Sequence, residues 1–342
     1  MTSVLKDHFE PTLWPLLHLK PAFDYPIAIF SPFQRLLRER GSRLAKEELP
    51  VSASVERPEG FYENYIQERY NLSVKIKTVS EPEEPLTPAG LLESFSAELH
   101  QDISLLSREN FPQATPPCHI EGAVSGLWIS PEARISPMAA IDTSEGPVVI
   151  EAGAKVGPFC FLKGPLYIGP DCYIDNAHIA HSRIGRASRI GGEVADTLIG
   201  DFSNKHHEGF LGHSLVGEWV NLGALTTTSD LKNNYGKIKL NYGKEEFPTG
   251  VIKFGSIIGN FVKTAIGTML NTGTILDVGA NIFAGRPSLK YYPPFFWGGE
   301  PAKYQAKRFL EDAAAIMKRR GQKPGDVETE ILRELLRENQ CP

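Results

Sequence analysis

The stretch from Phe202 to Thr226 reads FSNKHHEGFLGHSLVGEWVNLGALT, and in it a six-residue rhythm breaks at a histidine-rich loop and resumes at Val216 and Leu222. Before the break, aliphatic residues recur at every sixth position, in the runs Ile129, Ile135, Ile141 and Ile150, Val156, Leu162, Ile168, Ile174. A period of six fits neither an α-helix nor alternating strands. It predicts a β-solenoid in which each hexad forms one short strand and a corner, with one aliphatic side chain per hexad in an interior stack. The nine-residue steps Ile141 to Ile150 and Ile190 to Ile199 are predicted to hold small corner insertions.

The composition is that of a globular protein with a large core. With 342 residues, of which 41% are hydrophobic, the chain is expected to form two folding units. Its net charge of −5 and its dispersed basic residues give no reason to expect nucleic-acid binding. The N-terminal MTSVLKDHFEP is charged where a signal peptide needs an apolar run, and no membrane-spanning run is present, so we expect a cytoplasmic location and no membrane partner.

The hexad rhythm divides the chain into four segments. Residues 1–111 lack it and are predicted to form a small α+β domain, with a helix over 33–40, a strand over 73–79 and a longer helix over 88–108. A proline-rich linker over 112–119 precedes the solenoid domain, 120–299, which contains a long excursion at 227–255. Residues 300–342 are predicted to form two helices, one over 301–320 and one beginning after Asp326 as N-cap.

The four cysteines are Cys118, Cys160, Cys172 and Cys341. No pair has CxxC spacing, and two occupy small-residue positions of hexads. We expect reduced core residues.

Several hexads resemble the isoleucine-glycine repeats of the left-handed parallel β-helix acyltransferases, namely Ile184-Gly185, Ile190-Gly191, Ile199-Gly200, Val216-Gly217 and Leu222-Gly223. The run from His207 through Phe210-Leu211-Gly212 to Asn221-Leu222-Gly223-Ala224 resembles the acetyltransferase domain of the bifunctional UDP-N-acetylglucosamine diphosphorylase/glucosamine-1-phosphate N-acetyltransferase family. SNK-x-H-x-GFLGHS and LKNNYG point to the divergent branch of that family. The similarity covers Ser203 to Glu300, and the hexads extend it back to Ile129. It implies a left-handed parallel β-helix, acetyl-CoA as co-substrate, an amino sugar acceptor, and a homotrimer whose active sites lie between neighbours.

Histidine suits the general base of acetyl transfer because its pKa lies near working pH. His207 matches the family's base, with His206 and His213 as alternatives; from spacing alone, a loop histidine that caps backbone groups is the commoner case. The resemblance assigns further contacts to the acceptor or to coenzyme A, at Asn221, Ala224, Asn234 and Tyr235, and Arg286 is a candidate to meet a coenzyme A phosphate. Asn221 is equally consistent with an asparagine ladder at a solenoid corner. Lys303, Lys307 and Arg308 could meet coenzyme A phosphates, but are more simply a solvated helix face.

The sequence departs from the family at the sugar site. Phe210 replaces a tyrosine and Ala195 a phosphate-binding lysine. Phosphate recognition normally uses Arg or Lys donors, so Glu193, Lys205 and Lys232 are candidates to complete the acceptor site.

Three other functions stay open. The first is a non-catalytic trimeric scaffold or regulatory sugar-nucleotide binder. The second is a bifunctional enzyme that also transfers a nucleotidyl group, although residues 1–111 hold no glycine-rich phosphate loop. The third is a zinc hydrolase, which we rank lower because its pair of histidines five apart is missing, so no metal is expected.

Overall fold

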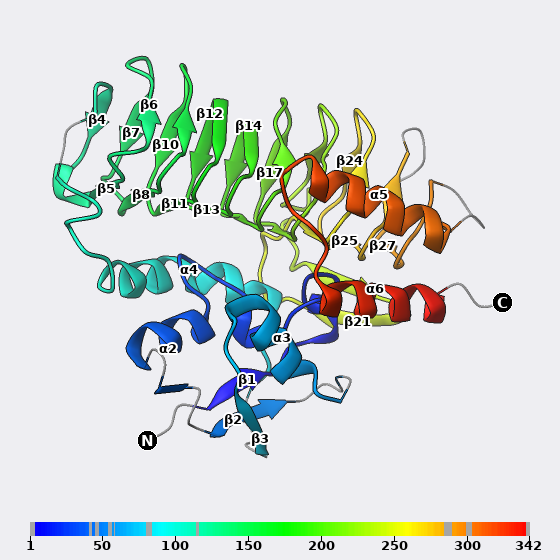
Figure 1. Ribbon diagram of the computed structural model, residues 1–342. Coiled ribbons are helices and arrows are strands. Elements are labelled where there is room, and N and C mark those ends of the chain that lie inside the picture. The colour runs from blue at the N-terminus through cyan, green and yellow to red at the C-terminus, as the bar shows by residue number, and fades with distance from the viewer. Residues whose placement is uncertain are drawn as a thin grey trace.

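The computed structural model describes residues 4–40, 43–44, 48–53, 57, 59–79, 84–113, 116–283, 289–298 and 303–339. The predicted solenoid is confirmed: short parallel strands stack in register along one axis (Figure 1). Each coil has three faces, which we call A, B and C, and face C is a sheet of nine strands. Because equivalent residues of successive coils pair directly, every side chain that points inward adds to one continuous core.

The strands divide among the faces as follows. Face A holds β6 (Arg134–Ile135), β9 (Lys155–Val156), the starts of β12 (Tyr173–Ala180) and β14 (Arg189–Ala195), β16 (Asn204–Lys205), β23 (Lys263–Thr264) and β26 (Asn281–Ile282). Face B holds β4 (His119–Glu121), β7 (Ala140–Asp142), β10 (Phe161–Lys163), the ends of β12 and β14, β17 (Phe210–Gly212), β19 (Thr227–Thr228) and β24 (Met269–Leu270). Face C holds β5 (Leu127–Ile129), β8 (Val148–Ile150), β11 (Leu166–Ile168), β13 (Arg183–Ile184), β15 (Leu198–Ile199), β18 (Leu215–Val216), β22 (Ser256–Ile258), β25 (Thr274–Leu276) and β27 (Tyr291–Tyr292).

The hexad aliphatics form the interior stack, and one of the two predicted insertions is corrected. Ile141 pairs with Leu162 on face B, and Ile150 with Ile168 on face C. The step from Ile141 to Ile150 holds a longer corner, as expected. The step from Ile190 to Ile199 does not, because Val194, on face B, also points into the core and is fully buried. The nine residues therefore make two short steps, from Ile190 on face A to Val194 on face B and from Val194 to Ile199 on face C.

Aromatic side chains line the corner between faces C and A. Phe202, Trp219, Phe261 and Phe295 have φ near +60°, which turns each side chain out of the corner. The rings of Phe202 and Trp219 stack with centroids 4.2 Å apart. Helices α5 (Ala306–Lys318) and α6 (Asp326–Asn339) cover this ladder through Phe309, Met317, Leu332 and Leu336. The apolar stripe of the last helix is thus docked.

Two helix starts differ from the sequence prediction. Helix α5 begins at Ala306 rather than Pro301, which lies outside the described residues, and Asp326 is the first residue of α6 rather than a cap before it.

The N-terminal region covers face C. Strands β1 (Leu5–Asp7), β2 (Glu48–Ala53) and β3 (Lys75–Val79) form a parallel sheet in the order β1-β2-β3, with α1 (Trp14–Leu17), α2 (Pro32–Arg40) and α3 (Phe61–Tyr70) between them. Helix α4 (Pro88–Ile103) then runs along the solenoid (Figure 1). It ends five residues before the predicted Arg108. Leu91, Phe95 and Leu99 pack with outward side chains of face C, including Val149 and Leu198.

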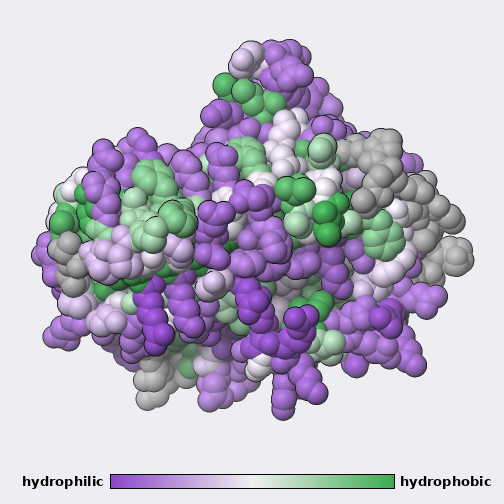
Figure 2. Space-filling model, turned by 90° about the horizontal axis from the view of Figure 1, so that it is seen from above, coloured by the Kyte–Doolittle hydropathy of each residue, from purple (hydrophilic) through white to green (hydrophobic). Residues whose placement is uncertain are grey.

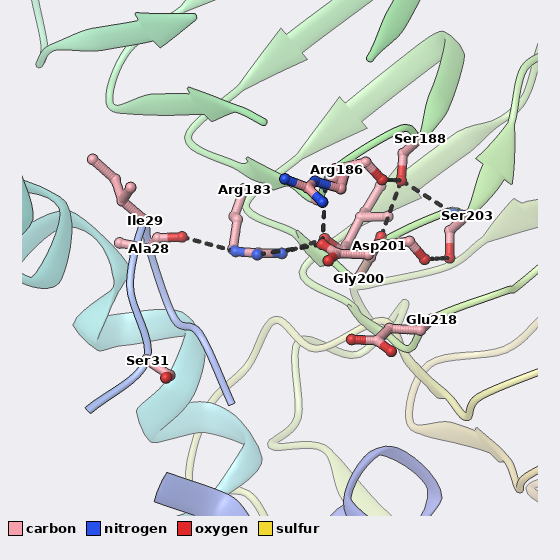
Figure 3. Close-up of polar contacts among 12 residues, drawn as sticks. Ala28, Ile29, Ser31, Arg183, Arg186, Ser188, Gly200, Asp201, Ser203 and Glu218 are labelled. Carbon is pink, nitrogen blue, oxygen red and sulfur yellow. Dashed lines mark hydrogen bonds and ion pairs between the residues drawn. The ribbon is translucent and has the colours of Figure 1, made fainter. Parts of the chain in front are cut away.

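A buried arginine connects the solenoid to the N-terminal region by hydrogen bonds. Arg183 on face C donates from Nε to the carbonyl of Ala28 at 2.8 Å and from Nη1 to that of Ile199 at 2.8 Å, and it faces Asp201 at 3.7 Å (Figure 3). Because its donors meet carbonyls on both sides, the guanidinium is buried without being left unpaired.

The excursion over 227–255 contains a β-hairpin, β20 (Lys239–Tyr242) with β21 (Glu245–Pro248). Ile238 and Leu240 are buried in the same cluster as Leu13 and Ile275, so the hairpin helps to join face C to the N-terminal region. Cys118, Cys160 and Cys172 are free thiols, and Cys341 lies outside the described residues. No helix in the described part of the chain is long and apolar enough to span a bilayer.

Candidate functional site

His207 lies on the corner between faces A and B, which residues 206–209 form after β16; we call these residues the histidine corner. Glycines let neighbouring coils approach it. A Cβ on Gly191 would lie 2.1 Å from the carbonyl oxygen of His206, and one on Gly209 would lie 2.2 Å from that of Thr226. Gly209 also has φ +128°, which L side chains rarely adopt. The coil geometry therefore fixes the backbone beneath His207.

Lys205 anchors the same corner from inside the core. It pairs with Ile190 at a stack position, where its side chain is buried, and Nζ donates to the carbonyls of Gly191 at 2.6 Å and His207 at 2.9 Å. Burial lowers the pKa of the Lys205 ammonium to about 8, which the carboxylates of Glu208 and Glu193 partly oppose. Its ammonium therefore points inward to carbonyls rather than out to an acceptor phosphate.

The two neighbouring histidines differ in burial. His207 is exposed, and within the described residues its imidazole has no hydrogen bond or ion pair. The ring of His206 lies 5.2 Å from that of His207 and 5.6 Å from that of Tyr173. Burial, and after it the charge of His207, lowers the pKa of His206, whose Nδ1 is buried without a partner in the described structure. His207 is the histidine that is open to a reactant.

Glu193 and Phe210 lie beside each other on face B, next to the histidine corner. Glu193 is exposed and also pairs with His178 on the preceding coil. Asn176 donates from Nδ2 to Oε1 of Glu208 at 3.1 Å across the corner. These residues form a polar surface that an acceptor near His207 would contact.

The remaining predicted residues are dispersed. Asn221 accepts from Asn204 Nδ2 at 2.9 Å, which is the ladder that the sequence left open, and Ala224 lies at the A/B corner on the next coil. Asn234 accepts from Gly236 N at 3.1 Å inside its own turn, and Tyr235 is exposed. Both belong to the excursion, which leaves the solenoid after Asp230, at the other end of face B. Arg286 lies outside the described residues.

Of the other candidate cations, Lys307 is exposed on α5, and three contact their neighbours. Lys232 donates to the carbonyl of Lys237 at 2.7 Å. On the C-terminal helices, Lys303 contacts the Asn339 carbonyl and Arg308 pairs with Asp312 at 3.2 Å.

His213 lies on the corner between faces B and C, in a ladder of alternating charges. Its Nδ1 is 2.7 Å from Asp230 and its Nε2 is 3.6 Å from Asp196. Asp196 in turn faces His181 at 3.5 Å, and His181 faces Glu145 at 3.0 Å. His213 borders a cavity of about 510 Å³ against α4, but both of its nitrogens face carboxylates.

A row of three basic side chains and one tyrosine on face A is a feature that the sequence reasoning missed. Arg134, Lys155, Tyr173 and Arg189 occupy paired positions on successive coils, each directly before an inward aliphatic residue. That position faces outward because side chains alternate along a strand, so the hexad alignment itself contained the signal. Within the described residues no three His, Cys, Asp or Glu side chains gather as metal ligands would.

No family model matches the chain. It is 28% identical over 182 residues to the bifunctional protein GlmU of a Cyanothece strain, covering 50% of this chain and 33% of that protein. GlmU of Methanococcus aeolicus is 33% identical over 149 residues, which are 41% of this chain and 34% of that protein. A bifunctional sugar-1-phosphate nucleotidylyltransferase/acetyltransferase of Sulfurisphaera tokodaii is 29% identical over 41% of this chain and 36% of its own length. The match spans only about a third of each of these relatives.

Solved structures with some similarity include a putative acetyltransferase of Bacillus cereus, with 18% identity and a TM-score of 0.31 over 60% of this chain and 97% of that one. PerB of Caulobacter crescentus, solved with CoA and GDP-perosamine, has 13% identity and a TM-score of 0.18 over 75% and 96% of the two chains. In its hexad repeats and its solenoid the chain is similar to the hexapeptide-repeat β-helix acetyltransferases, and its sequence has distant similarity to GlmU bifunctional proteins over part of its length.

Proposed function

We propose that the protein is an acetyl-CoA-dependent N-acetyltransferase that acts on an amino sugar phosphate or a sugar nucleotide, with His207 as general base. The observation that carries the proposal is the presentation of His207: an open imidazole on a corner whose backbone Lys205 and two glycines hold in place. The named activities of the relatives support the same reaction class.

The reaction needs little more than this arrangement. The acceptor amine attacks the thioester carbonyl, a base accepts the proton that the nitrogen loses, and the tetrahedral intermediate collapses with coenzyme A thiolate as leaving group. A neutral imidazole on an exposed corner can accept that proton, and the resulting imidazolium can protonate the leaving thiolate. Glu193 and Phe210 on face B, with Asn221, would contact the sugar, and Ala224 the acetyl donor.

A homotrimer would complete this site. The A/B corner carries a row of exposed apolar side chains, with Met138 and Phe159 before the histidine corner and Leu225, Ile266 and Phe283 after it. Figure 2 shows hydrophobic patches among hydrophilic ones on the face that is seen from above. Exposed apolar rows of this kind mark ligand-binding or subunit contacts. We propose that a neighbouring subunit and the acyl donor share this row.

Nucleotidyl transfer is not part of the proposal. In doubly wound folds, phosphates bind beyond the carboxyl ends of the parallel strands. At the end of β1, Asp7 is buried and accepts from Arg57 Nε at 2.9 Å, Tyr62 at 3.0 Å and the backbone of Ala22 at 2.6 Å. A carboxylate network fills the place where a phosphate would need donors.

The test is acceptor-dependent release of coenzyme A from acetyl-CoA, followed with a thiol reagent across glucosamine 1-phosphate, other amino sugar phosphates and amino-sugar nucleotides. Loss of a general base lowers the rate about 10²- to 10⁴-fold, so His207→Ala should lose most activity while it keeps a wild-type circular dichroism spectrum. His119→Ala, an exposed histidine on β4 at the start of the solenoid, is the matched control. Full activity of His207→Ala would refute the assignment of the base.

A second candidate is a non-catalytic sugar-nucleotide binder. Catalytic histidines usually have a hydrogen-bond partner that orients the ring. Within the described residues no group orients the ring of His207, which favours the binder over the enzyme. Tight nucleotide-sugar binding without release of coenzyme A from any acceptor would support it over acetyl transfer.

A further inference from the structure

A pocket of about 610 Å³ opens on face A beside the histidine corner. Its lining includes Arg134, Lys155, Arg189, Arg320 and the ring of His206, and Tyr173 also lines it. We call it the basic pocket. Two carboxylates, Glu132 and Asp171, also line it, so the cations outnumber the anions even with His206 neutral.

The cations span several coils in a defined order. Arg134 pairs with Lys155, Lys155 with Tyr173, and Tyr173 with Arg189. Neighbouring strands lie ~4.8 Å apart, so the row extends over roughly 14 Å. A single phosphate is too small to reach both ends of such a row. A diphosphate that bears a nucleoside is long enough, and the exposed ring of Tyr173 offers it a stacking surface.

The two carboxylates that line the basic pocket offset only part of its positive charge. Within the described residues, Arg134, Lys155 and Arg189 have no hydrogen bond or ion pair to a carboxylate. Arg320 is fixed by Nη1, which donates to the Ala187 carbonyl at 3.0 Å. Burial, followed by repulsion from Arg189 and Arg319, lowers the pKa of the Arg320 guanidinium. Cations gathered without partners, next to a buried and unpaired His206 Nδ1, indicate an anionic ligand.

The position of the basic pocket separates it from the acetyl donor. Its strands precede the histidine corner in the chain, whereas Ala224, proposed for the donor side, lies one coil after it. The two substrates would therefore approach His207 from opposite directions along the solenoid axis. On face B, Ala195 stands in place of the phosphate-binding lysine, and Lys163 pairs with Glu145 at 2.6 Å. The cations of face A are therefore better placed to hold a phosphate.

We propose that the basic pocket binds the diphosphate of a nucleotide-linked amino sugar, whose amine extends past His206 to His207. Only the last clause depends on the proposed acetyl transfer. Binding measurements alone test whether the basic pocket is a diphosphate site.

The experiment is titration calorimetry on the full chain with UDP, GDP, inorganic pyrophosphate and coenzyme A as separate probes. The variants are Arg189→Gln, Lys155→Gln and, as a control of equal charge change, Arg333→Gln, an exposed residue of α6 away from the basic pocket. A charge-assisted hydrogen bond corresponds to about tenfold to hundredfold in affinity, and we expect that loss for the nucleoside diphosphates in Arg189→Gln. Arg333→Gln should bind as the wild type does.

Three results would overturn the proposal: no binding of either nucleoside diphosphate or of pyrophosphate, equal affinities in Arg189→Gln and Arg333→Gln, or a loss confined to coenzyme A, which would assign the basic pocket to the donor. Acetyl-transfer kinetics separate this proposal from the proposed function. If the protein binds a diphosphate but does not transfer an acetyl group, the proposed diphosphate site stands and the proposed acetyltransferase function is rejected. If Arg189→Gln transfers the acetyl group with an unchanged KM for the acceptor, the acetyltransferase function stands and the proposed diphosphate site is rejected.

Discussion

Two corners of the solenoid are built on the same backbone and have opposite surroundings. At the C/A corner, Trp219 has φ +60° and is 5% exposed, whereas at the A/B corner Leu225 has φ +62° and is 56% exposed. Helices α5 and α6 cover the first corner, and within the described residues nothing covers the second. The coil geometry therefore determines where a side chain points, and the segments outside the repeats determine whether it becomes core or binding surface.

The largest change in the free energy of unfolding is expected when a buried aromatic side chain is removed from the C/A corner. Truncating a buried tryptophan costs about 3–5 kcal/mol, so Trp219→Ala should lower the free energy of unfolding by that amount in urea titration. Leu225→Ala makes the same kind of change at the same φ but on an exposed residue, and should stay within ~0.5 kcal/mol. A comparable loss in Leu225→Ala would instead show that a subunit covers the A/B corner in solution.

The second effect concerns Lys205, which brings a charge into the core beneath the exposed corner. Its folded pKa of about 8 lies below its ordinary value of 10.5, so between these pH values the unfolded chain binds a proton that the folded chain does not. Wild-type stability should therefore rise through this window relative to Lys205→Leu, by up to about 3 kcal/mol. Unfolding of both proteins by urea between pH 7 and 10 measures it. Lys155→Leu, on the exposed side of the same face, is the matched control for the loss of a lysine.

The repeats could be predicted well from the sequence because each hexad places one aliphatic residue in the interior stack, which makes the period of six visible. The sequence identified the solenoid, the excursion and the two C-terminal helices. The C/A step is six residues long throughout, from Ile129–Ile135 to Leu276–Ile282, and this regularity made the rhythm visible. The steps around face B vary because corner lengths there differ, which is why Val194 was missed as a core residue.

The candidate site was less accessible to sequence reasoning. His207 could be placed on a loop by the break in the rhythm, but its exposure depends on Gly191 and Gly209 of neighbouring coils. Lys205 was taken for a phosphate ligand although it occupies the stack position six residues after Ile199, where an inward direction was predictable. The basic pocket also needs Arg320, which comes from a segment that the repeat pattern does not describe.

The third effect tests the charged B/C corner against the histidine corner. His213→Asn keeps a residue type that tolerates φ +44° but loses the bond to Asp230. We expect about 1 kcal/mol less stability and acetyl transfer within a few-fold of wild type. Thermal unfolding and the coenzyme A assay measure the two quantities. If activity instead falls as far as in His207→Ala, the general base lies at the B/C corner, and His207 is only a neighbour.

The smallest effect lies under the helices that cover the C/A corner. Glu328 of α6 borders a cavity that Trp219 and Glu218 also line, and burial, with repulsion from Glu218, raises its pKa to about 7. The folded chain therefore holds this proton above pH 4.5, where the unfolded chain releases it, so the contribution is present below pH 4.5 and is lost as pH rises through about 7.

Glu328→Gln cannot ionise, so its stability relative to wild type should increase between pH 4.5 and 7, by about 1 kcal/mol after allowance for partial exposure. Glu330→Gln, at an exposed residue of the same helix, is the matched control for a change of glutamate to glutamine on α6. A flat difference for Glu328→Gln across this range would mean that water reaches the carboxylate. The cover over the C/A corner would then be looser at α6 than its apolar contacts indicate, and the contrast between the two corners would rest on α5 alone.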